Sequence, residues 1–192
     1  MRLRRTSLAV AVLFTVPMVL LTVSGTVASA KTPTGTGTIT CTTFTATITF
    51  KPALVPGTAT SPKDTEKSSG SVISSCSTSP SGGPTSASKV KEKPTKFSSN
   101  ACSQLEASST GASFTISWPG LKPSKVTFSG ATNTSTGYKL TDGTVTGSYP
   151  TSGGASATIN IAPASETAAS NCVEGKGGSL SSLTISGGSM TL

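Results

Sequence analysis

Apolar residues alternate with threonine and serine along much of the chain. In residues 44–50 every second residue is apolar and the residues between them are threonines. A period of two places the apolar side chains on one face of a β-strand. Ile39 and Cys41 have the opposite parity, so a bulge or a strand break is expected at Thr42 and Thr43. The pattern therefore predicts a half-buried strand with a local irregularity near its start.

The same alternation recurs in short runs separated by turn residues. In residues 114–118 it ends at Pro119 and places Trp118 on the core face. Asp142-Gly143 is expected to form the turn of a hairpin over residues 138–149. Further strands are expected at residues 69–77, 89–97, 126–128, 155–161 and 180–192, and helical turns at 101–107 and 163–171, the latter capped by Ser165. This series predicts an all-β fold: an antiparallel β-sandwich, immunoglobulin-like or jelly-roll-like, with one or two short helical turns.

The first 30 residues have the pattern of a removable secretory signal. Three arginines precede an apolar run at residues 8–21, and Ala28-Ser29-Ala30 supplies the small residues of a cleavage site. The run is too short for an ordinary membrane span. We expect a signal peptide at 1–30, a flexible tail at 31–36 and a single β domain at 37–192. The expected location is extracellular, either free or associated with the cell wall, with no membrane span after signal removal.

Removal of this signal lowers the net charge of the chain. The three arginines leave with it, so that of 15 basic residues 12 lysines remain against seven acids, a net charge of +5. The chain contains no histidine. Nucleic-acid binding is not expected, because it needs concentrated basic patches interleaved with aromatic residues. The composition favours a hydrated, mildly basic surface.

All four cysteines lie beyond the expected cleavage site. Cys41, Cys76, Cys102 and Cys172 form an even set in an exported chain, which predicts two disulfides. Three connectivities are possible, and we favour Cys41–Cys76 with Cys102–Cys172, because this places one bridge in each half of the chain. A zinc site is the competing interpretation, but its ligands usually come in close pairs, and no two of these cysteines are near neighbours.

Four lysines form the main cluster of charge, at Lys89, Lys91, Lys93 and Lys96. On a strand the first three point to one side, with Val90 and Glu92 on the other. Two interpretations remain open. The lysines contact anionic polymers of a cell envelope, or they protect an edge strand from pairing with another chain.

The residues that remain offer few routes to catalysis. Without histidine there is no Ser-His-Asp or Cys-His arrangement and no histidine-ligated zinc. Ser86 and Lys89 match the S-x-x-K spacing but lack the motifs that accompany it in known enzymes. A carboxylate pair is the other route, with candidates Asp64, Glu66, Glu92, Glu106, Asp142, Glu166 and Glu174. We therefore expect no enzyme activity, no catalytic residues, no metal site and no cofactor.

Several short segments of the second half occur in a recognisable order. They are residues 114–118, 124–130, 143–149, 168–172 and 183–192. Together they resemble a group of small exported proteins from actinobacteria that are of uncharacterised function. The resemblance implies export and a disulfide-bonded β fold, and it implies no catalytic residues.

These observations favour a non-catalytic binding or structural module of the cell exterior, with no specific partner indicated. One alternative is a small-molecule carrier with an apolar cavity between the sheets. Another is a hydrolase that uses carboxylates or the Ser86–Lys89 pair.

Overall fold

The fold is built almost entirely from antiparallel strands. The computed structural model describes residues 31–56, 65–96, 99–105 and 112–192, except for the side chains of residues 67, 68, 95 and 96. The strands are β1 (Thr38–Leu54), β2 (Thr65–Ser79), β3 (Lys89–Glu92), β4 (Thr95–Lys96), β5 (Ser113–Ser117), β6 (Ser124–Thr127), β7 (Gly130–Thr134), β8 (Gly137–Gly147), β9 (Thr151–Ile161) and β10 (Leu180–Thr191). A 3-10 helix, η1 (Cys102–Leu105), and an α-helix, α1 (Pro163–Val173), complete the described elements.

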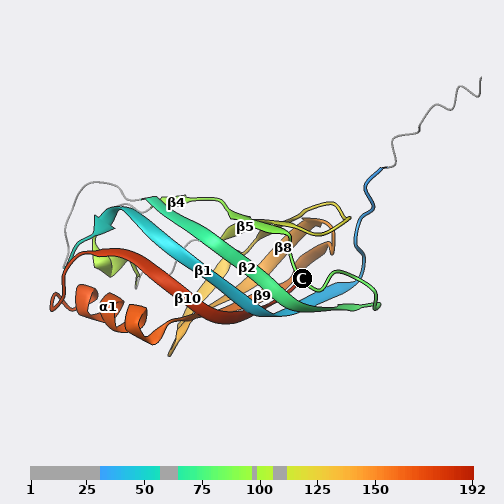
Figure 1. Cartoon of the computed structure of the whole chain (residues 1–192). Helices are drawn as coiled ribbons and strands as arrows, with labels where there is room; N and C mark the ends of the chain where they lie inside the picture. Colours follow the sequence, from blue (N-terminus) through green and yellow to red (C-terminus); the bar gives the residue numbers. More distant parts are fainter. Residues whose placement is uncertain (1–30, 57–64, 97–98, 106–111) are drawn as a thin grey trace, which may run out of the picture. The chain divides into compact units, whose positions relative to one another are not determined.

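The strands form one sheet in the order β3-β5-β6-β8-β9-β10-β1-β2-β4, with β7 paired to β8. The sheet curls into two layers, in which β10, β1 and β2 cross in front of β5, β8 and β9 (Figure 1). The curl brings the segment that precedes β3 against β2, because Ala87 N donates to Ile73 O and Cys76 N donates to Thr85 O. The expected antiparallel all-β fold is thus confirmed, with both layers belonging to a single continuous sheet.

Alternation along the strands places one large apolar cluster between the two layers. Phe114 lies at its centre, in edge-to-face contact with Phe44 and Phe128 at centroid distances of 6.2 and 6.3 Å. Trp118 is 3% exposed and packs edge-to-face on Tyr149, so it is a core residue. Its indole Nε1 donates a hydrogen bond of 2.8 Å to the buried Ser124 hydroxyl.

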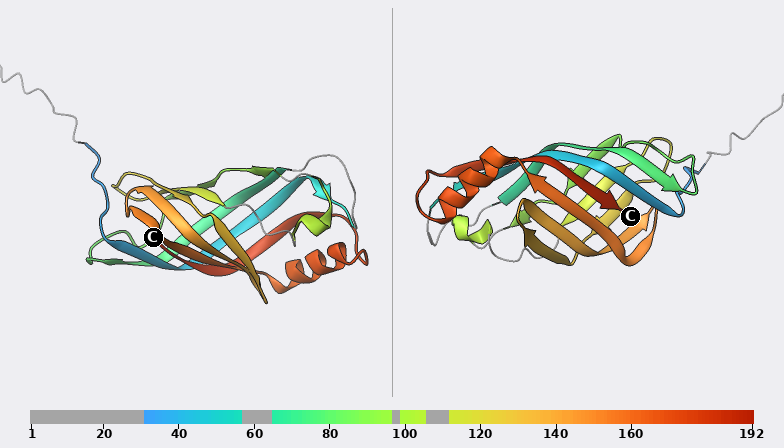
Figure 2. Two further views of the ribbon diagram at one scale, coloured as in Figure 1. Left: turned by 180° about the vertical axis from the view of Figure 1, so that it is seen from behind. Right: turned by 90° about the horizontal axis from the view of Figure 1, so that it is seen from below.

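A second cluster lies at the end of the sheet where the two helices are found. It contains Phe50, Leu54, Leu180 and Leu183, together with the disulfide-bonded Cys102 and Cys172. Figure 2 shows η1 and α1 side by side at this end. The disulfide between them therefore holds η1 against α1 at this second apolar cluster.

Both disulfides have the expected connectivity. Cys41–Cys76 joins directly paired positions of β1 and β2, and Cys102–Cys172 joins η1 to α1. Within the described residues there are no free cysteines. The pairing chosen from the sequence is therefore confirmed.

The expected hairpin turn at Asp142-Gly143 is wrong. β8 runs through both residues. The hairpin turn instead lies at residues 135 and 136, between the paired residues Thr134 of β7 and Gly137 of β8. Asp142 has a φ of 56°, and the register of β8 against β9 shifts between Leu140 and Gly143. Asp-Gly suits a bulge for the same reason as it suits a tight turn, since both need a residue with positive φ.

Two smaller expectations are also corrected. β1 does not break at Thr42 and Thr43, although its buried side changes there from Cys41 to Phe44. Its register shift against β2 lies further along the strand, between Thr45 and Thr47. Helix α1 begins after Ala162 without a side-chain cap.

Ser165 has a different role from the one expected. Its hydroxyl accepts a hydrogen bond of 3.0 Å from Thr184 N and so ties α1 to β10. A serine in the first helical turn is therefore used here for a contact between elements.

The segment at 31–36, expected to be a flexible tail, forms hydrogen bonds with the β5–β6 and β8–β9 connections. Tyr149 N donates to Gly35 O, Gly35 N donates to the buried Ser148 hydroxyl, and Lys122 N donates to Pro33 O. A side chain at position 35 would meet the Tyr149 ring at 2.8 Å. Gly35 is therefore the residue that lets this segment lie against the ring.

Candidate functional site

The exposed side of β3 and β6 carries a group of lysines, which we call the lysine face: Lys89, Lys91, Lys93 and Lys125. Along β3 the lysines are exposed, whereas Val90 and Glu92 between them are half-buried and Val90 packs on the core. Lys93 continues the ladder, because its backbone N donates to Ser113 O. The alternation expected from the sequence therefore places three lysines on one surface.

Lys125 joins this surface through the register of the sheet. Lys91 pairs with Thr115, and Thr115 pairs in turn with Lys125. Directly paired residues of an antiparallel sheet lie on the same face. The sequence pattern did not single out Lys125, although its alternation with the buried Ser124 and Val126 indicates an outward side chain.

The lysine face is cationic and rich in hydroxyl groups. Around it, the outward positions paired in β5, β6 and β8 are all serine or threonine: Ser113, Thr115, Ser117, Thr127, Thr144 and Thr146. In the described part of the chain, none of the four lysines forms a salt bridge; the ion pair that is present joins Lys176 to Glu174. The face thus presents positive charge to solvent without neighbouring carboxylates in these rows.

Lys96 lies elsewhere in the sheet order. Its backbone belongs to β4, which pairs with β2, whereas β3 pairs with β5. Its side chain lies outside the described residues. The lysine face therefore comprises three of the four lysines expected from the sequence, together with Lys125.

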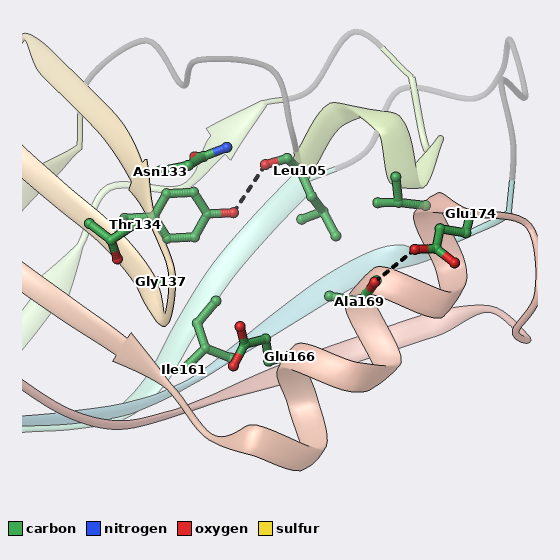
Figure 3. Close-up of a pocket in the computed structure, with 11 residues that line it drawn as sticks. Leu105, Asn133, Thr134, Gly137, Ile161, Glu166, Ala169 and Glu174 are labelled. Carbon is green, nitrogen blue, oxygen red and sulfur yellow. Dashed lines mark hydrogen bonds between the residues drawn. The ribbon is translucent and has the colours of Figure 1, made fainter.

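A groove of about 280 Å³ lies at the helix end of the sheet. Helix α1 forms one side and the β7–β8 hairpin forms the other, with Leu105 of η1 above and Ile161 below (Figure 3). The Tyr138 hydroxyl donates a hydrogen bond of 3.1 Å to Leu105 O and so joins the hairpin to η1. Sequence reasoning missed this site, because its walls come from segments far apart in the chain.

Two of the candidate carboxylates line this groove, at opposite ends of α1. Glu166 belongs to the first turn, whereas Glu174 follows the last residue of the helix. Eight residues of helix separate their backbones by about 12 Å. Glu174 is exposed, and its pKa is lowered by a hydrogen bond from Lys176. Glu174 is therefore bonded to its own neighbours, Lys176 and Ser170.

Two of the other candidate acids, Glu66 and Glu92, lie on separate strands, β2 and β3. Asp64 and Glu106 lie outside the described residues, and Asp142 is exposed at the bulge of β8. Ser86 and Lys89 lie on an extended segment, where three residues span about 10 Å. On a helix the same spacing would make them neighbours.

Burial raises the pKa of Tyr138, and the negative charge of Glu66 raises it further. Burial also raises the pKa of Tyr149. A raised pKa favours the neutral phenol in the folded state, so this stability is fully present below the unfolded value of 10.0 and is lost as pH rises through the folded value. We expect the urea midpoint to fall above about pH 10, and to fall less steeply in Tyr138→Phe. An equal decline in both proteins would contradict this.

Two observations on the described residues and a comparison with known proteins bear on the function. In the portion of the chain that the structure describes, no three histidine, cysteine or acidic side chains gather as they would around a metal ion. Among the same residues, no helix has both the length and the apolar character needed to cross a membrane. No protein-family model, curated protein or solved structure matches the chain. Any function has therefore to be argued from the geometry of its own residues.

Proposed function

We propose that this protein is a non-catalytic, extracellular binding module that holds anionic polymers of the cell envelope on its lysine face. The observation that carries the proposal is the continuous row Lys91–Thr115–Lys125, flanked along β3 by Lys89 and Lys93. Positive charge is concentrated there without acidic neighbours in the same rows, which favours attraction of a polyanion.

The spacing of the lysines suits an extended chain of charges. Successive lysines on β3 are two residues apart, or about 6.7 Å along the strand, and β3 and β6 lie about 10 Å apart across β5. A flexible polymer with one negative charge every few ångströms can therefore contact several lysines at once. The serines and threonines between them supply hydroxyl groups that hydrogen-bond phosphate or carboxylate oxygens.

The extracellular setting is supported by the two disulfides. Such bridges persist in oxidising compartments and are rare where thiols are kept reduced. An extracellular domain with a cationic face meets envelope polymers as its nearest large anions. A role as a protected edge strand is compatible with this one, because β3 also lies at an end of the sheet order.

Neutralising the lysine face is expected to weaken retention on purified cell wall by about 30-fold. The change is Lys89→Gln, Lys91→Gln, Lys93→Gln and Lys125→Gln together. Each exposed charge contact contributes roughly 0.5 kcal/mol, so four contribute about 2 kcal/mol. Retention is measured by co-sedimentation of the disulfide-bonded protein with the wall over a range of protein concentrations.

The matched control removes the same amount of charge elsewhere, at Lys31, Lys51, Lys139 and Lys176. It is expected to reduce retention by less than about three-fold, because general attraction depends only weakly on remote, screened charges. Equal losses in the two quadruple variants would show that net charge alone accounts for retention. Wild-type retention that is unchanged in high salt would also refute the proposal.

A further inference from the structure

We propose that the groove between α1 and the β7–β8 hairpin binds a small organic ammonium ion, with Glu166 as its counter-ion and Tyr138 as its aromatic wall. This inference goes beyond the proposed function, because the lysine face binds anions and this groove has the opposite charge preference. The two sites lie on different elements, so each can be tested without altering the other.

The charged residues of the groove select for a cation. Among the described residues that line it, the ionisable side chains are those of Glu166, Glu174 and Tyr138, and none is a lysine. Glu174 already has a cation, since Lys176 Nζ lies 2.7 Å from its Oε2. Glu166 is half-buried and has no ion-pair partner among the described residues.

The orientations of Glu166 and Glu174 agree with the assignment of Glu166 as the counter-ion of a ligand. In Figure 3 the Glu166 side chain extends from α1 toward Ile161, whereas Glu174 turns back along the helix toward Ser170, with which it forms a hydrogen bond of 3.3 Å. The Glu166 carboxylate is therefore the anionic group offered to a ligand in the groove. This groove is acidic, although the chain beyond residue 30 has 12 lysines and seven acids, a net charge of +5.

The remaining lining residues favour an ammonium ion with a short apolar body over a metal ion. Four of them offer apolar surface: Leu105, Ile161, Ala169 and Val173. A metal ion needs several oxygen ligands at close range, whereas an alkylammonium ion combines one charge with carbon that packs on such a surface. The volume of about 280 Å³ lies just below the usual range for drug-sized ligands, so the ligand is small.

Tyr138 provides the aromatic contact typical of ammonium recognition. Organic cations are attracted to the face of an aromatic ring, particularly where the ring is partly shielded from water. The hydrogen bond from its hydroxyl to Leu105 O fixes the position of the side chain before a ligand arrives. The phenol of Tyr138 is neutral at physiological pH, and burial and the charge of Glu66 raise its pKa further above the ordinary value of 10.0.

The test uses n-butylammonium as the probe, with n-butanol and butyrate as uncharged and anionic molecules of nearly the same shape. Each is titrated into the disulfide-bonded, isotopically labelled protein, and amide chemical shifts are followed by NMR. We expect n-butylammonium to shift resonances of α1 and the β7–β8 hairpin with a dissociation constant on the order of 1 mM, as suits a ligand of so few atoms. Butanol is expected to bind at least about ten-fold more weakly, and butyrate not to bind.

Two substitutions separate the two contacts. Glu166→Gln is expected to weaken n-butylammonium about ten-fold and to leave butanol unchanged, whereas Tyr138→Leu weakens n-butylammonium about five-fold. Asp142→Asn is the matched control and is expected to change the affinity less than two-fold, because that carboxylate is exposed on β8 and does not line the groove. The dispersion of the amide spectrum reports whether each variant is folded.

Three outcomes would overturn the inference. Butanol binding as tightly as n-butylammonium would show that the groove does not select charge. An unchanged affinity of Glu166→Gln for n-butylammonium would show that Glu166 is not the counter-ion of the ligand. The third outcome is that the amide chemical shifts of the groove residues do not change at about 100 mM n-butylammonium, a hundred-fold above the expected dissociation constant. This would show that the groove does not bind such ions.

Discussion

Replacing Cys102 and Cys172 together by alanine is expected to lower the free energy of unfolding by about 4 kcal/mol. The bridge closes a sequence separation of 70 residues, and both half-cystines are fully buried. In the chain-entropy model, a loop of this length greatly restricts the unfolded state. The same bridge fastens η1 to α1 over the second apolar cluster, so its loss is also expected to loosen the groove. Urea unfolding of the double variant and the wild type measures the difference.

The matched control is the double variant Cys41→Ala and Cys76→Ala. That bridge spans 35 residues and joins strands that an extended ladder of hydrogen bonds already aligns, so the expected loss is smaller. If removing Cys102–Cys172 leaves the midpoint of unfolding unchanged, the helices are held by packing alone. A native protein that reacts with an alkylating agent would contradict the disulfide assignment itself.

Phe128→Ala is expected to destabilise the protein by about 3–5 kcal/mol, since it empties a large space in a close-packed core. The Phe128 ring is fully buried and contacts Phe114 edge-to-face. Gly143 in β8 leaves the space that the ring occupies, because a Cβ there would lie 2.8 Å from the Phe128 ring. Thermal and urea unfolding give the change in stability.

A surface substitution supplies the comparison for this prediction. Val72 is 51% exposed on β2, and Val72→Ala is expected to change stability by no more than about 0.5 kcal/mol. Phe128→Leu keeps most of the buried volume and is expected to fall between the two. A loss below about 1 kcal/mol in Phe128→Ala would show that the core relaxes around the missing ring.

The alternation of apolar and hydroxyl residues is enough to predict most of the strands and the core. It places Phe44, Phe114 and Trp118 inside, as observed, since the period of two depends only on local geometry. It is not enough at Asp142-Gly143, where one dipeptide suits both a turn and a bulge. Only the pairing of β8 with β9 decides between them, and that pairing is a long-range property.

The two candidate sites also depend to different degrees on local sequence pattern and on long-range pairing. The lysines of β3 are predicted to share a face because they lie two residues apart in one strand. Lys125 joins them through β5, and the groove combines Leu105, Tyr138 and Glu166 from three separate segments. Such neighbours follow from the order of strands in the sheet and from the disulfide that docks η1 on α1. Neither can be derived from local periodicity.

The salt dependence of binding to a soluble polyanion tests the proposed role of the lysine face most directly. The probe is a synthetic poly(glycerol phosphate), and its association constant is measured by calorimetry at several salt concentrations. Four lysine contacts at about 0.7 released counterions each predict a slope of about −3 in log K against log salt. We expect this slope for the wild type and for the control lysine variant, and a slope near zero for the variant that lacks the lysine face. Equal slopes for the two quadruple variants would contradict the proposed binding site.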